Sequence, residues 1–118
     1  MAFDFDLFVI GGGSGGVRAA RVAAQGGAKV GLAEEDKYGG TCVQRGCVPK
    51  KLMVFASEFP GAIEDAAQYG WTVHSGSFDW PAFRAKLEAE LDRLEGVYRN
   101  ILGNAGVQSF DASAVVAD

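Results

Sequence analysis

Residues 3–16 of the chain read FDFDLFVIGGGSGG, and this stretch decides the fold class. Its first eight residues alternate between apolar and polar side chains and then become continuously apolar. That change is typical of a strand that enters a buried parallel sheet. A run of glycines with one serine follows at once. The pattern predicts a strand over Phe3–Ile10 that ends in a glycine-rich turn.

The segment after the glycine run predicts a helix and then a second strand. Val17–Gln25 is rich in alanine and other helix formers, and we expect Gly26 and Gly27 to end this helix. Ala28–Ala33 has the apolar character of a strand. Strand, helix and parallel strand together make a βαβ unit of about 30 residues. The fold class is therefore α/β.

The middle of the chain predicts helices. We expect a helix over Thr41–Glu58 that Pro60 and Gly61 bound, and a short helix over Ala62–Tyr69. Gly70–Asp79 is expected to be a loop. These assignments leave a long, mainly helical stretch after the βαβ unit.

The last third of the chain predicts a long helix and two short strands. Asp79 suits a helix cap and Pro81 suits a first turn, so we expect a helix over Pro81–Leu102. Its apolar residues recur every three or four positions and form one stripe. They are Phe83, Leu87, Leu91, Leu94, Val97, Tyr98 and Ile101. The strands are expected over Val107–Phe110 and Ala114–Ala117.

Length and composition exclude several classes of protein. The chain has 118 residues, which is one domain or part of one, and its 48% apolar and 22% charged residues are those of a globular protein. A net charge of −4 argues against a nucleic-acid partner. The first ten residues have no basic region, so we expect no signal peptide, and no apolar run reaches about 20 residues, so we expect no membrane association and a cytoplasmic location. Two cysteines and one histidine make a zinc site of four ligands unfavourable, and we expect no metal.

The glycine run satisfies the GxGxxG pattern of dinucleotide-binding loops. The pattern alone is weak, but here it follows an expected strand, opens an expected helix, and Glu34 lies 23 positions after Gly11. Glycines allow a tight turn and a close approach of the backbone to a pyrophosphate. The helix start then offers unpaired N–H groups to the phosphates. The alternative is a flexible glycine-rich turn.

A second motif is the pair of cysteines in CVQRGC, residues 42–47. On an ideal helix the two Cα atoms would lie about 8.6 Å apart, beyond the ~7 Å limit for a disulfide. A bridge would therefore need a distorted turn, which Gly46 permits. So small a ring adds roughly 2 kcal/mol of stability and suits a bond that is made and broken. Cys42 is expected at a helix start, and this position and the nearby Arg45, Lys50 and Lys51 favour the thiolate. The alternative is two buried free cysteines.

Together, VIGGGSGG and GGTCVQRGCVPKK resemble the class I pyridine nucleotide-disulfide oxidoreductases. Within that family the chain is most similar to the members that reduce glutathione disulfide. The resemblance implies a Rossmann-like FAD-binding domain, as the N-terminal portion of a doubly wound parallel sheet with a long helical insertion. It implies that residues 1–118 are the N-terminal part of this domain, in a longer protein whose NADPH and dimerisation domains lie elsewhere.

The resemblance also implies roles for individual residues. Cys47 would lie against the flavin, Cys42 would attack the substrate disulfide, and Lys50 would lie near the reactive nitrogen of the flavin; these three are the catalytic candidates. The cofactor-binding candidates are Gly11, Gly13, Ser14, Gly15, Gly16, Glu34, Gly40, Thr41, Cys42, Lys50 and Ala114. The substrate-binding candidates are Ser14, Arg21 and Tyr98.

The implied reaction is a relay in a homodimeric enzyme. NADPH reduces FAD, FAD reduces the Cys42–Cys47 disulfide, and the dithiol reduces glutathione disulfide. The family's acid–base histidine and nicotinamide domain are absent here, so we expect these residues alone to be inactive. His74 lies in a polar loop, matches no motif of the family, and is expected to be a surface residue.

Two departures keep other functions open. Arg18 stands where many relatives have a small residue, and Ile101 stands where polar residues are common. Related disulfide substrates are therefore alternatives: trypanothione, which Arg21 disfavours, thioredoxin or dihydrolipoamide. A non-catalytic nucleotide-binding fragment with inert cysteines is a third possibility.

Overall fold

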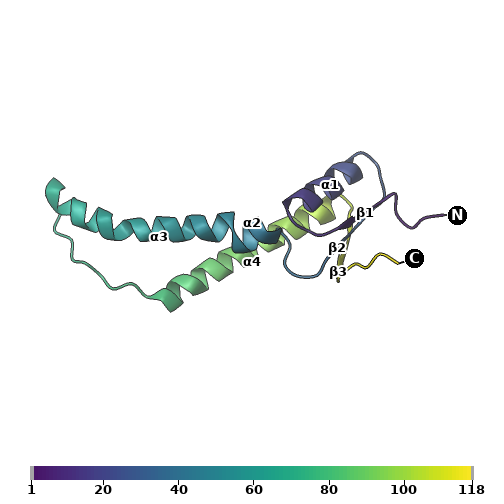
Figure 1. The fold of residues 1–118 in the computed structure, drawn as a ribbon. Coiled ribbons are helices and arrows are strands. Elements are labelled where there is room, and N and C mark those ends of the chain that lie inside the picture. The colour runs from purple at the N-terminus through teal and green to yellow at the C-terminus, as the bar shows by residue number, and fades with distance from the viewer. Residues whose placement is uncertain (1, 118) are drawn as a thin grey trace.

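The computed structural model describes residues 2–117 and shows an α/β fold built on a parallel sheet (Figure 1). In chain order the elements are β1 (Leu7–Ile10), α1 (Ser14–Gln25), β2 (Val30–Glu34), α2 (Gly40–Arg45), α3 (Cys47–Ala66), the single 3-10 turn η1 (Ala67–Tyr69), α4 (Trp80–Asn104) and β3 (Gln108–Asp111). The strand order is β1-β2-β3. The long stretch from α2 to α4 is thus a helical insertion between two neighbouring parallel strands.

The predicted βαβ unit is confirmed. Leu7 pairs with Val30 and Ile10 with Ala33 in a parallel register, and α1 crosses between the two strands. Gly26 caps α1, and Gly27 has a φ of +98°, which favours glycine and turns the chain back toward the sheet. The first strand is shorter than expected. It begins at Leu7 because its partner β2 begins only at Val30, so the residues before Leu7 have no strand opposite them.

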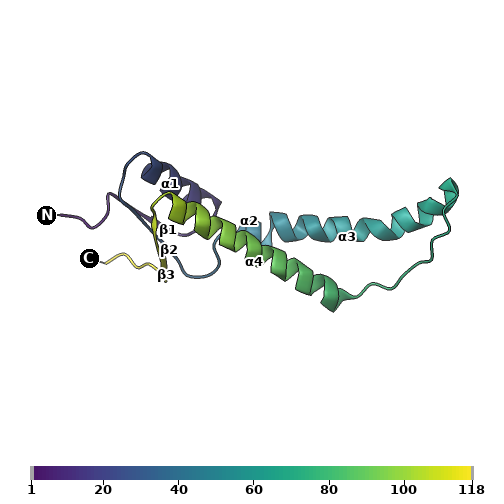
Figure 2. The same cartoon turned by 180° about the vertical axis from the view of Figure 1, so that it is seen from behind.

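The core lies on one face of the sheet, beneath α1 and the C-terminal half of α4. Its buried members come from both helices and the strands β2 and β3 or their flanks, and they are Val17, Ala20, Val30, Leu32, Tyr38, Leu102 and Val107. Figure 2 shows α1 and the end of α4 running alongside one another at this end of the molecule. These contacts fix the position of the C-terminal ends of β1 and β2.

The opposite face of the sheet carries an aromatic cluster that stays accessible. Phe5, Phe8 and Phe110 meet with ring centroids 5.5–6.0 Å apart. Phe8 remains 43% exposed and Ile10 61% exposed. The expectation that the first strand is buried is therefore wrong within residues 2–117. The strand β1 lies at the edge of the sheet, and only its α1 side is covered.

The helix expected over Thr41–Glu58 is two helices. The chain breaks at Gly46, whose φ of −132° and ψ of −108° fit neither α2 nor α3. The break brings the Cα atoms of Cys42 and Cys47 to 4.7 Å, which an unbroken helix does not allow. The covalent bridge therefore outweighs the helix propensity of the surrounding residues.

Pro60 does not end the helix, contrary to the prediction. It lies inside α3, which runs on to Ala66, so the separate helix expected over Ala62–Tyr69 is the end of α3 followed by η1. Proline removes one backbone donor and leaves the carbonyl four residues earlier unpaired. Most of the helix around Pro60 is exposed, so solvent can take the place of the missing donor.

The helix α4 confirms its predicted start. The Asp79 side chain accepts a hydrogen bond from the Ala82 N–H at 3.0 Å, and Pro81 lies in the first turn. The apolar stripe is largely confirmed: Leu87 and Leu91 are buried, whereas Val97 is 38% exposed. Gly70–Asp79 is a loop, as expected, and His74 is exposed within it.

The helix α3 and the first half of α4 project from the sheet as a long arm (Figure 1). The molecule measures 75 × 26 × 17 Å, and its radius of gyration is 20.6 Å. A compact chain of this length would have a radius of gyration of about 13 Å. The arm explains the difference, and it carries exposed apolar side chains such as Phe55 and Phe59.

The strand β3 lies one residue later than predicted, at Gln108–Asp111, and pairs in parallel with β2. Residues 114–117 form no strand, so the second short strand expected there is wrong. Within residues 2–117 the sheet ends at β3, which leaves Ala114–Ala117 without a strand to pair with. No helix in this part of the chain is long and apolar enough to span a membrane.

Candidate functional site

The glycine run forms the turn between β1 and α1. Gly11 has a φ of +102°, and its N–H donates to the Ala33 carbonyl at 2.8 Å. A Cβ built on Gly16 would lie 1.9 Å from the Gly11 carbonyl oxygen. No side chain fits at this position, because the Gly11 carbonyl oxygen belongs to the backbone and cannot move aside. The last glycine of the GxGxxG pattern therefore permits the close packing of α1 on β1.

The N-terminus of α1 opens at this turn. The first backbone bond of the helix runs from the Val17 N–H to the Gly13 carbonyl at 2.9 Å, so the N–H groups of Ser14, Gly15 and Gly16 precede the helical hydrogen-bond ladder. The first turn contains no acidic residue and no side-chain cap. Partly positive N–H groups at a helix start are well suited to hold a phosphate.

Glu34 ends β2 beside the same turn. One carboxylate oxygen accepts the Gly12 N–H at 2.7 Å, and the other accepts the Asp36 N–H at 3.0 Å. A Cβ on Gly12 would crowd Glu34, at 3.2 Å from its Cβ. The carboxylate is thus fixed between the ends of two parallel strands, where ligands bind in open α/β sheets. This arrangement fits the ribose of a dinucleotide whose pyrophosphate lies on α1.

The two glycine clusters meet backbone to backbone. The Gly39 N–H donates to the Gly12 carbonyl at 2.8 Å, and Gly13 and Gly39 form an isolated parallel bridge. Gly40 has a φ of +65°, and a Cβ on it would lie 2.7 Å from the Gly13 Cα. This contact, which we call the glycine junction, places the start of α2 beside the start of α1.

Cys42 and Cys47 form a disulfide that spans the break between α2 and α3. The prediction that a bridge needs a distorted turn at Gly46 is confirmed. Cys42 is half-buried in α2, whereas Cys47 is exposed and is the first residue of the 20-residue helix α3. A thiolate at Cys47 would therefore lie at the partly positive end of a long helix.

The basic residues near the disulfide differ in their surroundings. Arg45 forms an ion pair with Asp36, which offsets its charge. Lys51 lies over the Phe55 ring, 5.6 Å from the centroid. Lys50 lies in the first turn of α3 and is exposed. Of the three predicted cations, Lys50 is the one that no ion pair or ring contact engages within residues 2–117.

The remaining candidates lie on other elements. Ser14 is exposed at the start of α1, and Arg21 is half-buried further along this helix. Tyr98 lies on α4 and packs against the core. Ala114 follows β3 and is half-buried. The structure brings the glycine run, Glu34 and the cysteines together, but in the described part of the chain no hydrogen bond or ion pair links Arg21, Tyr98 or Ala114 to them.

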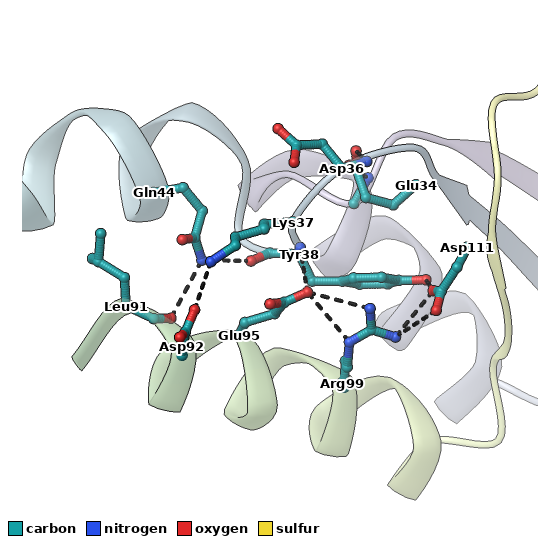
Figure 3. A network of polar contacts seen from close by, with 11 residues as sticks. Glu34, Asp36, Lys37, Tyr38, Gln44, Leu91, Asp92, Glu95, Arg99 and Asp111 are labelled. Carbon is teal, nitrogen blue, oxygen red and sulfur yellow. Dashed lines mark hydrogen bonds and ion pairs between the residues drawn. The ribbon is translucent and has the colours of Figure 1, made fainter. Parts of the chain in front are cut away.

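A network around Tyr38 supports the cysteine motif, and the sequence did not predict it (Figure 3). Tyr38 is fully buried, and its hydroxyl donates to Asp111 on β3 at 2.9 Å. The Arg99 guanidinium lies over the Tyr38 ring, 4.2 Å from its centroid, and 3.0 Å from the same aspartate. The network thus joins the segment before α2 to α4 and β3.

The network shifts the ionisation of its members. The hydrogen bond from Arg99, with a second from Tyr38, holds the pKa of Asp111 below its usual value. Burial, and then the hydrogen bond to Asp111, raise the pKa of Tyr38. The hydrogen bond to Asp111 also raises the pKa of Arg99. The aspartate stays charged and the phenol stays neutral at neutral pH.

One signal for this network was present in the sequence. Glu95 and Arg99 have the i, i+4 spacing of a helical ion pair, which the structure forms at 3.2 Å. Nothing local points to Tyr38 and Asp111, because they are 73 positions apart. Gln44 extends the network toward the disulfide, since its side chain donates to the Tyr38 carbonyl at 3.1 Å.

Comparison with known proteins agrees with this geometry. The model of the family described as pyridine nucleotide-disulphide oxidoreductase matches residues 5–118. The glutathione reductase of Burkholderia cepacia is 56% identical over 115 residues, which are 98% of this chain and 26% of that protein. The glutathione reductase of Nostoc sp. is 51% identical over the whole chain and 26% of its own length. The chloroplastic/mitochondrial glutathione reductase of Pisum sativum is 45% identical over 98% of the chain and 23% of its own length.

The chain spans about a quarter of the length of these relatives. With a family match over nearly all its residues, and with a dinucleotide-type turn joined to a disulfide, the chain belongs to the pyridine nucleotide-disulphide oxidoreductase family.

Proposed function

We propose that this chain is the FAD-binding, disulfide-bearing part of an enzyme that uses NADPH to reduce glutathione disulfide. The observation that carries the proposal is the glycine junction, which sets the dinucleotide-type turn beside the helix of Cys42. Relatives named glutathione reductase match nearly the whole chain at 45–56% identity, which supports this substrate.

The residues of the chain fit FAD. Gly16 and Gly40 let the chain's own backbone segments pack closely around the turn, and Gly15, with nothing within 4 Å of an added Cβ, leaves open space for a pyrophosphate at the start of α1. We assign Ser14 and Gly15 to that group and Glu34 to the ribose, with Gly11 and Gly13 shaping the turn. Gly40, Thr41 and Lys50 would line the flavin, and Ala114 the adenine. When bound, FAD would supply the two electrons that reduce the disulfide.

The cysteines then carry out thiol–disulfide exchange. Two electrons and two protons convert the Cys42–Cys47 bond to two thiols. The Cys42 thiolate attacks one sulfur of glutathione disulfide, forms a mixed disulfide and releases one glutathione, which takes up a proton. The Cys47 thiolate next attacks the Cys42 sulfur, releases the second glutathione and restores the bridge. The exposure of Cys47 and its place at the start of α3 suit a sulfur that faces the flavin.

The substrate assignment rests on charge. Glutathione disulfide carries several carboxylates, and Arg21 offers a guanidinium that no ion pair engages within residues 2–117. Ser14 and Tyr98 add hydroxyl groups. An acidic disulfide is favoured over a neutral one at such a site.

Titration of the chain with FAD tests the cofactor assignment. We expect the flavin fluorescence to change on binding, and we expect Gly16→Ala to abolish the change, because its Cβ would collide with the Gly11 carbonyl. Gly103→Ala is the matched control, since Gly103 is helical and has nothing within 4 Å of an added Cβ. A wild-type chain that does not bind FAD, or equal binding by both variants, would contradict the assignment.

Trapping of the mixed disulfide tests the substrate. The reduced Cys47→Ser chain, mixed with glutathione disulfide, is expected to gain the mass of one glutathione at Cys42. Arg21→Met should slow the reaction of Cys47→Ser with glutathione disulfide more than its reaction with a neutral disulfide such as oxidised lipoamide. Equal slowing with both disulfides would argue against an acidic substrate.

A further inference from the structure

Gln44 lies inside the ring that the disulfide closes, and its side chain points toward the Tyr38 network (Figure 3). Its amide nitrogen donates to the Tyr38 carbonyl at 3.1 Å and, in a longer contact of 3.4 Å, to the Leu91 carbonyl. An amide NH₂ group has two donors, so both of its hydrogens are used. The side chain links α2 to the loop before it and to α4.

Both acceptors are fixed points of the fold. Tyr38 is fully buried and held by Asp111, and Leu91 is 8% exposed on the apolar stripe of α4. The other polar side chain near this ring, Arg45, pairs with the exposed Asp36. Exposed pairs of this kind contribute little, so the Gln44 contacts are the stronger polar tie between the ring and the body of the molecule.

The tie matters most when the disulfide is open. In the oxidised chain the covalent bond itself keeps Cys42 close to Cys47, 4.7 Å between Cα atoms. In the reduced chain α2 is a helix of only six residues, too short to hold its own conformation. The position of Cys42 then depends on contacts such as those of Gln44.

We propose that Gln44 is a positioning residue for the cysteine pair: its amide keeps the reduced Cys42 within reach of Cys47. This inference rests on the proposed redox role of the pair. It predicts a high effective concentration of one thiol toward the other, and hence a stable disulfide. In the closed state the covalent bond holds α2 in place, so removal of the amide costs this state the full contact. The open state can relax and loses less, so the equilibrium shifts toward the dithiol.

The experiment measures that equilibrium directly on the full chain. The chain is equilibrated in buffers of reduced and oxidised glutathione, quenched by alkylation, and analysed by mass. Two glutathione molecules reduce one protein disulfide and become one glutathione disulfide. Gln44→Met removes both donors, keeps the length of the side chain and adds no charge. The net value of one hydrogen bond corresponds to about a five-fold lower equilibrium constant for disulfide formation, or about 20 mV.

Gln68→Met is the matched control. Gln68 lies in η1 at the far end of the arm and is exposed, and its side chain makes no hydrogen bond in the described part of the chain. We expect its equilibrium constant to equal that of the wild type. Gln44→Asn is a second variant, to be used if Gln44→Met does not fold. It keeps the amide but is one methylene shorter, and it is expected to shift the equilibrium toward the dithiol as well.

Equal equilibrium constants in a folded Gln44 variant and in Gln68→Met would overturn the proposal. A variant that merely loses stability without a positioning effect would unfold at lower urea concentration and yet keep the wild-type equilibrium. This test is independent of the test of the proposed function. The proposed function fails if the wild-type chain does not bind FAD, whereas the thiol–disulfide equilibrium is measured without flavin.

Discussion

Gly40 and Gly13 approach so closely that a Cβ on Gly40 would lie 2.7 Å from the Gly13 Cα. The two residues belong to different motifs, one at the turn before α1 and the other at the start of α2. Gly39 adds a hydrogen bond to the Gly12 carbonyl beside them. The dinucleotide-type turn and the disulfide are therefore one structural unit, and a change at the junction acts on both.

Replacement of Gly40 by alanine is expected to destabilise this unit. The Cβ would meet backbone atoms that cannot move aside, and the φ of +65° is itself unfavourable for alanine. We expect a loss of at least about 2 kcal/mol in the free energy of unfolding, measured with urea. Gly61→Ala, inside α3 with nothing within 4 Å of the added Cβ, should instead gain up to about 1 kcal/mol. Similar losses in both variants would contradict the close contact.

Glu34→Gln is expected to cost about 1–2 kcal/mol in the free energy of unfolding. The carboxylate accepts one N–H at each oxygen, from Gly12 and from Asp36. A glutamine has one acceptor and one donor at these places, so one N–H would face an NH₂ group. Glu35→Gln removes the same charge from the neighbouring exposed residue and should leave stability within about 0.5 kcal/mol of the wild type. Urea unfolding that shows no difference between the two would exclude this role of Glu34.

The predictable part of this fold is the part where local pattern and tertiary contact agree. The glycine run predicts both the turn and the packing of α1, because Gly16 is needed for a local close approach. The spacing of Cys42 and Cys47 predicts that a bridge needs a distorted turn, which Gly46 permits, since no regular helix can close so short a ring. The helix expected over Thr41–Glu58 does not include that break. Asp79 predicts the start of α4 by a hydrogen bond within one turn.

The unpredicted part depends on contacts between distant residues or on exposure. Pro60 is a helix breaker by local rules, but α3 continues through it where the helix is mostly open to solvent. The Tyr38–Asp111 hydrogen bond joins residues with no common motif. Ala114–Ala117 has the composition of a strand, yet strand formation also requires a pairing partner, which the described sheet does not offer.

Tyr38→Phe is expected to change how steeply stability falls at alkaline pH. Burial and Asp111 raise the pKa of Tyr38, so the folded chain holds the phenol proton more tightly than the unfolded chain. The resulting stability is fully present below the ordinary tyrosine pKa of about 10 and is lost as pH rises through the folded value. At neutral pH the variant should lose about 1 kcal/mol, for the hydrogen bond.

Urea unfolding at several pH values between neutrality and about pH 11 measures this slope. The wild type should lose stability above about pH 10 more steeply than Tyr38→Phe. Tyr69→Phe is the control, because Tyr69 is 84% exposed, and it should keep the wild-type slope. Parallel curves for the wild type and Tyr38→Phe would rule out a buried neutral phenol.

Asp111→Asn is expected to destabilise the chain at neutral pH and to have a smaller effect in acid. Arg99, and then Tyr38, lower the pKa of Asp111, so the unfolded chain binds this proton more readily than the folded chain. The contribution of the carboxylate is therefore present above the ordinary aspartate pKa of about 4 and is lost as pH falls through the folded value.

The difference in unfolding free energy between the wild type and Asp111→Asn should narrow below about pH 4. Added salt should reduce this difference at neutral pH, because the Arg99–Asp111 pair is exposed. Asp65→Asn, on the exposed arm, should show neither effect. A pH-independent difference for Asp111→Asn would mean that the aspartate acts through packing and not through its charge, and the link from β3 to Tyr38 would then not be electrostatic.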